Sequence, residues 1–180
     1  MSKCVVLIGP PCSGKSTIGK SLAYNIGYKY ISSGDIARKM AEKDGSIEDL
    51  NAGNMAPEDM MREEIAKILG SDDDIILDGF PRFSDQYEWM INRFMHRTFA
   101  FIFIDAPILA LSTRATSRGR SDDAAFDKRI SYYNQNTVPM VNRINKDMAM
   151  HDGVTYITNS DAVHKVVKKV EDCLHDRGWI

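Results

Sequence analysis

Short runs of apolar residues alternate along the chain with longer segments in which apolar residues recur every three or four positions. A short continuous run is typical of a strand buried on both faces, and the longer spacing is typical of an amphipathic helix. The alternation predicts stacked strand–helix–strand units and therefore an α/β fold with a parallel sheet. The five predicted strands are Lys3–Ile8, Tyr28–Ile31, Asp74–Leu77, Phe99–Ile104 and Val154–Ile157.

Two stretches in the second half of the chain show the helical spacing most clearly. One runs from Phe126 to Met148 and the other from Val163 to Leu174, and we expect both apolar stripes to pack against the core. Pro139 lies inside the first stretch. Because proline removes one backbone hydrogen bond from a helix, we expect it either to kink the helix there or to separate two helices.

Composition and charge are those of an ordinary globular chain. The 180 residues suffice for one domain with one core, and 43% hydrophobic against 27% charged residues excludes a disordered protein. The net charge of −2 provides no general attraction for nucleic acid, so a polyanionic ligand has to be bound by a local group of cations. We therefore expect no nucleic-acid partner.

Cysteine spacing and the length of the apolar runs bear on location. Cys4, Cys12 and Cys173 form no C-x-x-C pair, which argues against a disulfide framework and favours a reducing compartment. The longest apolar runs are far shorter than the roughly 20 residues of a membrane span, and Gly9 ends the first one too early for a signal peptide. These observations predict a cytoplasmic protein with no membrane partner.

The segment Gly9–Thr17, between the first strand and the helix after it, matches the pattern G-x-x-x-x-G-K-[ST]. Its glycines let backbone N–H groups converge on phosphate oxygens, and the helix that starts at Gly14 adds the positive end of its dipole. Lys15 would bind the outer phosphates, and the Ser16 hydroxyl is a ligand for Mg²⁺. The pattern predicts a P-loop NTPase fold, with a nucleoside triphosphate such as ATP bound by Cys12, Ser13, Gly14, Lys15, Ser16 and Thr17. The loop alone does not choose among GTPases, ATPases and small-molecule kinases.

A second group of polar residues follows the third strand. Asp78 stands at the carboxyl end of a parallel strand, beside the expected phosphate loop, where it can hold Mg²⁺ through its water shell. Arg82 offers a guanidinium fork suited to bidentate contact with phosphate. A GTPase is excluded, because the nearest approach to its guanine-reading N-K-x-D pattern, Asn145-Lys146-Asp147, has the acid one position too early.

With these motifs the chain resembles the adenylate kinase family of nucleoside monophosphate kinases. The blocks that carry the resemblance are Gly9–Thr17; Ser33-Gly34-Asp35 with Arg38; Gly53–Pro57; Leu77–Arg82 with Gln86; and Arg118–Asp123 leading to Arg129 and Thr137–Pro139. The resemblance implies one P-loop kinase domain over residues 1–180, with a three-layer fold and a five-stranded parallel sheet flanked by helices. Residues 32–61 would form the segment that binds the monophosphate, and residues 118–125 a short lid.

The resemblance also implies direct in-line transfer of the γ-phosphoryl group of MgATP to a nucleoside monophosphate. The Gln86 carboxamide has one donor and one acceptor for the Watson–Crick edge of adenine, whereas pyrimidine-specific relatives typically carry Asn there. AMP is therefore the expected acceptor. The residues implied for its binding are Ser33, Arg38, Met55, Ala56, Gly79, Arg82, Gln86, Arg120 and Arg129.

Positive charge is concentrated between Thr113 and Arg129, where five basic residues stand against three acidic ones. A transferring phosphoryl group needs such a concentration. Arg114 and Arg118 are four apart on a predicted helix and share a face. Both are implied to bind ATP, as is the turn after the last strand, which includes Asp161. The implied catalytic residues are Lys15, Arg82, Arg118, Arg120 and Arg129.

The chain departs from the family pattern at several points. Its phosphate loop ends Gly-Lys-Ser-Thr where adenylate kinases usually have Gly-Lys-Gly-Thr, and the segments Asp35–Gly53 and Asp123–Arg129 are shorter than usual. The lid has no Cys or His, so no zinc is expected there. A kinase for UMP, CMP or another small acceptor is an alternative, as is a nucleotide-binding module without turnover. A monomer is expected.

Overall fold

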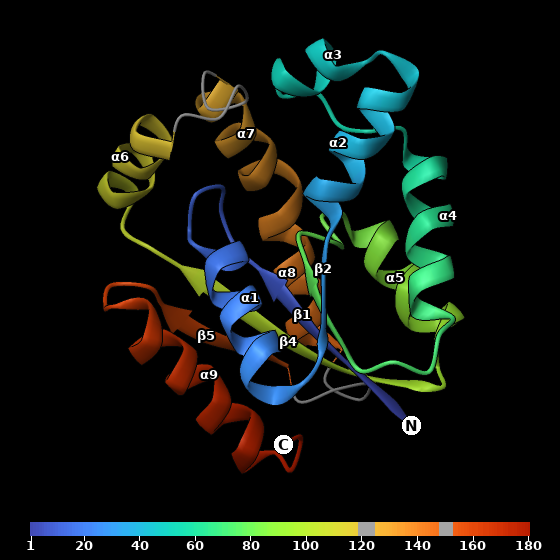
Figure 1. Ribbon diagram of the computed structural model, residues 1–180, viewed down its shortest axis with the longest axis vertical. Coiled ribbons are helices and arrows are strands. Elements are labelled where there is room, and N and C mark those ends of the chain that lie inside the picture. Colours follow the sequence, from blue (N-terminus) through green and yellow to red (C-terminus); the bar gives the residue numbers. More distant parts are fainter. Residues whose placement is uncertain (119–124, 148–152) are drawn as a thin grey trace.

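The computed structural model describes residues 1–118, 125–147 and 153–180, apart from the side chain of Arg118. Within these residues, strands form one fully parallel sheet in the order β2-β3-β1-β4-β5 (Figure 1). They are β1 (Ser2–Ile8), β2 (Lys29–Ser32), β3 (Ile75–Asp78), β4 (Arg97–Asp105) and β5 (Val154–Thr158). The five strands predicted from the hydrophobic pattern are confirmed, and their ends differ by at most two residues.

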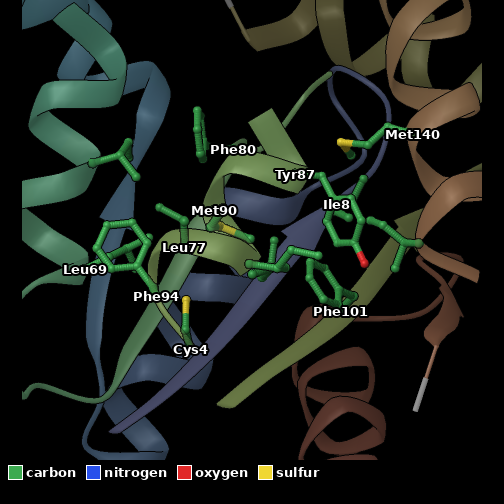
Figure 2. Close-up of a cluster of buried hydrophobic side chains, with 14 of the residues drawn as sticks. Cys4, Ile8, Leu69, Leu77, Phe80, Tyr87, Met90, Phe94, Phe101 and Met140 are labelled. Atoms are coloured by element: carbon green, nitrogen blue, oxygen red, sulfur yellow. The ribbon is translucent and has the colours of Figure 1, made fainter. Parts of the chain in front are cut away.

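Successive residues of the central strands enter two separate apolar layers. On β1, Val6 belongs to one buried cluster and Val5 to the other. Figure 2 shows the first cluster, in which the rings of Tyr87 and Phe101 meet edge to face with centroids 5.7 Å apart. Because both faces of β1 are covered, its sequence reads as a continuous apolar run and not as an apolar–polar alternation.

Helices supply the outer two layers. α1 and α9 contribute apolar residues to the cluster that contains Val5, and α4, α5 and α8 contribute to the cluster that contains Val6. These helices are α1 (Lys15–Ile26), α4 (Glu58–Leu69), α5 (Ser84–Arg93), α8 (Val138–Lys146) and α9 (Val163–Asp176). The arrangement confirms the predicted three-layer fold. None of the helices described has the combination of length and apolar character that crossing a membrane requires.

Further helices stand above the carboxyl ends of the strands, where ligands bind in open parallel sheets. In Figure 1, α2 and α3 lie on one side of the loop that follows β1, opposite α6 and α7. Their bounds are α2 (Ser33–Asp44), α3 (Ile47–Asn51), α6 (Ile108–Arg118) and α7 (Phe126–Tyr132).

The stretch around Pro139 is helical without interruption. A π-helical turn, η2 (Tyr133–Thr137), joins α7 to α8, and Pro139 falls in the first turn of α8. In the widened turn the N–H of Val138 donates to the carbonyl of Tyr133, five residues earlier. A proline inside a continuous helix cannot donate to the carbonyl of the preceding turn, so the regular hydrogen-bond pattern is interrupted at that point. Pro139 therefore does not separate two helices, which was one of the two expectations. The widened turn just before it accommodates the proline within a continuous helical stretch.

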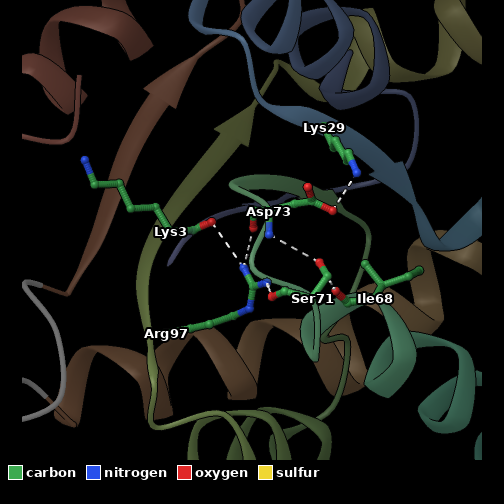
Figure 3. Close-up of polar contacts among 6 residues, drawn as sticks. All are labelled: Lys3, Lys29, Ile68, Ser71, Asp73 and Arg97. Atoms are coloured by element: carbon green, nitrogen blue, oxygen red, sulfur yellow. Dashed lines mark hydrogen bonds and ion pairs between the residues drawn. The ribbon is translucent and has the colours of Figure 1, made fainter. Parts of the chain in front are cut away.

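A buried arginine anchors the loop that leads into β3. Arg97 is 4% exposed, and Figure 3 shows its guanidinium close to Lys3, Ser71 and Asp73. Its Nε donates to the carbonyl of Leu69 at 2.6 Å, one terminal nitrogen donates to that of Asp73 at 2.8 Å, and the other to that of Ser71. One charged side chain thereby donates to three backbone carbonyls, of which that of Leu69 is buried.

We expect the substitution Arg97→Met to lower the free energy of unfolding by about 3 kcal/mol, because one buried and two partly buried carbonyls lose a charge-assisted bond. The measurement is denaturant unfolding followed by circular dichroism. Lys29→Met is the matched control, since it removes only the exposed ion pair with Asp73, which is worth about 1 kcal/mol or less. Equal effects of the two substitutions would contradict the role given to Arg97.

Candidate active site

The loop between β1 and α1 has the conformation that its glycines predict. Gly9 and Gly14 have φ values of 148° and 93°. A Cβ at Gly9 would lie 2.0 Å from the carbonyl oxygen of Ile104, and one at Gly14 would lie 2.4 Å from Nδ2 of Asn159. Both positions therefore require glycine for space as well as for backbone conformation. The result is a tight loop at the N-terminus of α1, a favourable place for an anion.

Lys15 is the first residue of α1, and its side chain turns back over the loop. Its Nζ donates to the carbonyls of Gly9 and Pro10 at 2.8 and 2.7 Å and to the hydroxyl of Ser13 at 3.3 Å. Burial lowers the pKa of Lys15 to about 8, and the nearby Asp78 carboxylate opposes that shift. The ammonium thus lies in the phosphate loop, and its hydrogen-bond partners among the described residues are all neutral oxygens.

Asp78 lies beside this loop because the register pairs it with Leu7 on β1 and with Ser32 on β2. It is 4% exposed, and its Oδ2 accepts hydrogen bonds from the hydroxyls of Ser16 at 2.7 Å and Tyr30 at 2.6 Å. Burial and the Asp78 carboxylate raise the pKa of Tyr30, so its hydroxyl remains a donor. The predicted proximity of Asp78 to the phosphate loop is confirmed.

The oxygen donors of this corner fit Mg²⁺. No three His, Cys, Asp or Glu side chains gather into a metal cage in the part of the chain that the structure describes. Mg²⁺ is commonly held by one carboxylate together with waters and the phosphates of a substrate. Ser16 and Asp78 provide that small set of donors, next to a loop that suits a polyphosphate.

A second group of cations lies across the cavity. The Nε of Arg82 donates to the carbonyl of Gly79 at 2.7 Å, while its terminal nitrogens make long contacts of 3.5 Å with Ser33 Oγ and Met55 Sδ. Burial, together with repulsion from the positive charge of Arg129, lowers the pKa of Arg82 to about 10. The terminal nitrogens of this fork are therefore only weakly engaged. Close by, Arg38 lines the same cavity and forms an ion pair with Asp35.

One cavity of about 410 Å³ connects the two groups. It runs from the phosphate loop to the Arg82 group, and side chains of α6, α7 and η2 complete its wall. Two anionic ligands can therefore meet in a single space. The predicted site residues that line the cavity are Cys12, Gly14, Lys15, Ser16, Thr17, Ser33, Arg38, Met55, Asp78, Gly79, Arg82, Arg114 and Arg129.

The α7 helix and the segment after α3 are in contact above the cavity. The Nζ of Lys128 donates to the Asn54 side-chain oxygen at 2.6 Å and to the Ala52 carbonyl at 3.2 Å. Gly53 has a φ of 80°, and a Cβ there would lie 2.9 Å from that of Ala125. These contacts join the predicted acceptor segment to the helix that follows the predicted lid.

Gln86 does not line the cavity in this arrangement. It is 3% exposed, its Oε1 accepts from the backbone N–H of Arg82 at 2.8 Å, and its Nε2 donates to Glu58 at 2.8 Å. Glu58 in turn accepts a hydrogen bond from Arg62 at 2.6 Å. Both ends of the carboxamide thus have partners inside the protein, and the role expected for Gln86 at the acceptor base stays a prediction. Contact with a base would require the amide to leave Glu58.

Three other predicted residues also lie outside the cavity wall. The Asp161 carboxylate pairs with Lys169 at 2.6 Å on the surface, Ser13 is fully buried beneath the loop, and Ala56 packs against the core. The surface pairing of Asp161 leaves only its turn, and not its side chain, near the phosphate loop. Arg120 and the rest of the predicted lid after Arg118 lie outside the described residues, as does the Arg118 side chain.

One residue of the predicted donor turn, Asn159, contacts the phosphate loop directly, and one residue of the site was not predicted. Asn159, directly after β5, donates to the carbonyl of Ser13 at 2.7 Å and its own carbonyl accepts from Arg114 at 3.1 Å, which ties the last turn to the phosphate loop. Its place at the end of a parallel strand is the reason the sequence puts this turn beside the loop. Tyr30 lies within a strand, where a tyrosine is indistinguishable from a packing residue, and no sequence signal points to its contact with Asp78.

Comparison with known proteins gives a consistent result. A family profile described as an AAA domain matches residues 8–128, which is more than half of the chain. UMP-CMP kinase 2 of Caenorhabditis elegans is 28% identical over 192 aligned residues, which cover 98% of this chain and all of that protein. Adenylate kinase of Thermus thermophilus is 29% identical, covering 78% of this chain and 82% of that protein. Adenylate kinase of Encephalitozoon cuniculi is 30% identical, covering 76% and 80% respectively.

Proposed function

Because the chain belongs to the adenylate kinase family and is a nucleoside monophosphate kinase, we propose that it transfers the γ-phosphoryl group of MgATP to AMP. The observation that carries this proposal is the single cavity with the phosphate loop at one end and the Ser33, Arg38 and Arg82 group at the other. A donor triphosphate and an acceptor monophosphate bound at these ends would share one continuous cavity. Such positioning is the largest part of phosphoryl-transfer catalysis.

In the proposed reaction an oxygen of the acceptor monophosphate attacks the γ-phosphorus in line. A bond forms between them as the bond from that phosphorus to the β–γ bridging oxygen breaks, and ADP leaves. The attacking oxygen is already anionic, so no general base is needed. Charge spreads over the transferring group, and Lys15, Arg82 and Arg129 lie around the cavity to stabilise it.

Each end of the cavity has a distinct task in this reaction. The loop N–H groups and Lys15 bind the donor phosphates, and Arg114 lies beside the loop because its guanidinium contacts the carbonyls of Ser13 and Asn159. Ser16 and Asp78 would hold Mg²⁺, which neutralises charge on the donor phosphates when it is bound. The proposed lid residues Arg118 and Arg120 would add further positive charge.

Two observations bear on the base of the acceptor. Gln86 supports adenine, because a carboxamide has the donor and acceptor that the Watson–Crick edge of adenine requires. For this role the base would take the place of Glu58 on Nε2. Similarity to UMP-CMP kinase 2 over nearly the whole chain favours UMP or CMP as a second candidate.

We expect AMP to have the highest kcat/KM when the purified protein is assayed with ATP and each of AMP, UMP and CMP. Gln86→Asn shortens the amide and should lower the AMP preference by about tenfold, the cost of losing one good hydrogen bond to the base. Gln135→Asn, on the exposed part of η2, is the matched control. The comparison uses the ratio between acceptors within one preparation, so a loss of folded protein cancels. A wild type that prefers UMP or CMP would contradict AMP as acceptor.

A further inference from the structure

One oxygen of the Asp78 carboxylate accepts hydrogen bonds from two different elements. Ser16 Oγ and the Tyr30 hydroxyl both donate to Oδ2, at 2.7 and 2.6 Å, and within the described part of the chain no group donates to Oδ1. Two donors on one oxygen fix the rotation of the carboxylate about its Cβ–Cγ bond. Because Asp78 lines the cavity, the other oxygen is left for a ligand.

The Tyr30 ring is closely packed against α1. A Cβ at Gly19, in the interior of α1, would lie 2.7 Å from the ring carbon Cε2 and 2.8 Å from Leu7. A glycine inside a helix costs about 1 kcal/mol relative to alanine, so its place there indicates a packing reason. Lys20 also stacks on the ring, with Nζ 5.7 Å from the centroid. The ring therefore has little freedom, and its hydroxyl is directed at Asp78.

We propose that Tyr30 is a positioning residue for the metal of the MgATP donor, because its hydroxyl orients the Asp78 carboxylate so that Oδ1 meets the hydrated ion. This inference rests on the proposed use of MgATP. Partners that orient a metal-binding carboxylate from behind commonly determine metal affinity by a factor of ten or more. Tyr30 reaches Asp78 from β2, the strand paired with β3, whereas Ser16 reaches it from α1.

The alternative is that the hydroxyl only satisfies a buried carboxylate. The two roles differ in what they predict for ATP binding. A residue that merely supports the fold would alter the affinity for metal-free ATP and for MgATP by the same factor. A residue that positions the metal changes only the gain in affinity that Mg²⁺ provides.

The test is isothermal titration calorimetry of ATP binding to the purified chain, once with EDTA and once with excess Mg²⁺. The quantity compared is the dissociation constant with EDTA divided by the dissociation constant with Mg²⁺. We expect Tyr30→Phe to reduce this ratio by about tenfold, with the constant for metal-free ATP changed less than about twofold. Tyr24→Phe, whose side chain is 90% exposed on α1, is the matched control and should retain the wild-type ratio. Circular dichroism and the thermal midpoint report whether each variant is folded.

A second variant tests the packing of the Tyr30 ring against Gly19 while keeping the Tyr30 hydroxyl. Gly19→Ala should displace Tyr30 and reduce the same ratio, and it should cause no further reduction when combined with Tyr30→Phe. A Tyr30→Phe protein that retains the wild-type ratio overturns the role of Tyr30. A wild type whose affinity for ATP does not respond to Mg²⁺ would instead contradict MgATP as the donor, and with it the basis of the inference.

Discussion

Replacing Lys15 by Met is expected to lower kcat by at least about a hundredfold, or roughly 2.7 kcal/mol of transition-state stabilisation. The ammonium lies in the phosphate loop, with Nζ 2.8 Å from the carbonyl of Gly9 and 2.7 Å from that of Pro10. A donor phosphate would offer it a charged partner in place of neutral carbonyls. Methionine has a similar length but no charge. The measurement is steady-state turnover of ATP with AMP in a coupled assay.

The same substitution should leave the protein at least as stable at neutral pH. The folded-state pKa of Lys15, about 8, is below its ordinary value of 10.5, so between these values the unfolded chain binds more protons. The unfavourable contribution of the buried ammonium is therefore complete below pH 8 and disappears as the pH rises toward 10.5. At pH 7 methionine removes this cost. Denaturant unfolding checks the expectation, and a variant that is inactive because it is unfolded would contradict it.

Lys168→Met is the matched control for the loss of activity. Lys168 lies on the exposed face of α9, where it pairs with Asp172 four residues later, and it does not line the cavity. Its removal should leave kcat within about twofold of the wild type, because a surface ion pair contributes about 1 kcal/mol or less and only to stability. Wild-type activity of Lys15→Met would contradict the role given to the phosphate loop.

Strands and motifs were predictable from the sequence because each has a local cause. A strand covered on both faces reads as a continuous apolar run, so β1 and β4 could be located to within two residues. The sharp turns of the loop at Gly9 and Gly14 leave no space for a side chain, so its glycines mark it. The position of Asp78 beside that loop followed from the fact that parallel strands end at the same edge of a sheet.

Other features depend on residues that are distant in the sequence and could not be predicted. The Gln86 carboxamide has the right chemistry for adenine, but Glu58, 28 residues earlier, occupies its Nε2. From the sequence, Tyr30 is indistinguishable from a packing residue. Only the structure shows that its ring packs against Gly19 and that its hydroxyl donates to Asp78. The acceptor base depends on such contacts, and for that reason it needs an assay with competing acceptors.

The second large effect is expected for Arg82→Ala, which should lower kcat/KM for the acceptor by at least about a hundredfold while changing KM for ATP by less than about threefold. The Arg82 side chain lies at the acceptor end of the cavity, where its terminal nitrogens make only 3.5 Å contacts and can turn to a phosphate. A bidentate contact of guanidinium with phosphate is lost in the variant. Initial rates at varied ATP and varied AMP separate the two effects.

Loss of the side chain should not disturb the loop that carries it. The backbone N–H of Arg82 donates to Gln86 at 2.8 Å and its carbonyl accepts from the Thr137 hydroxyl at 3.1 Å, so the loop remains anchored when the guanidinium is gone. Arg93→Ala, in the last turn of α5 and outside the cavity, controls for a general loss of positive charge. A rise in KM for ATP equal to the loss with AMP would place Arg82 at the donor end, contrary to the proposal. A selective loss with AMP means that the two ends of the cavity bind different phosphates, as direct transfer between two bound nucleotides requires.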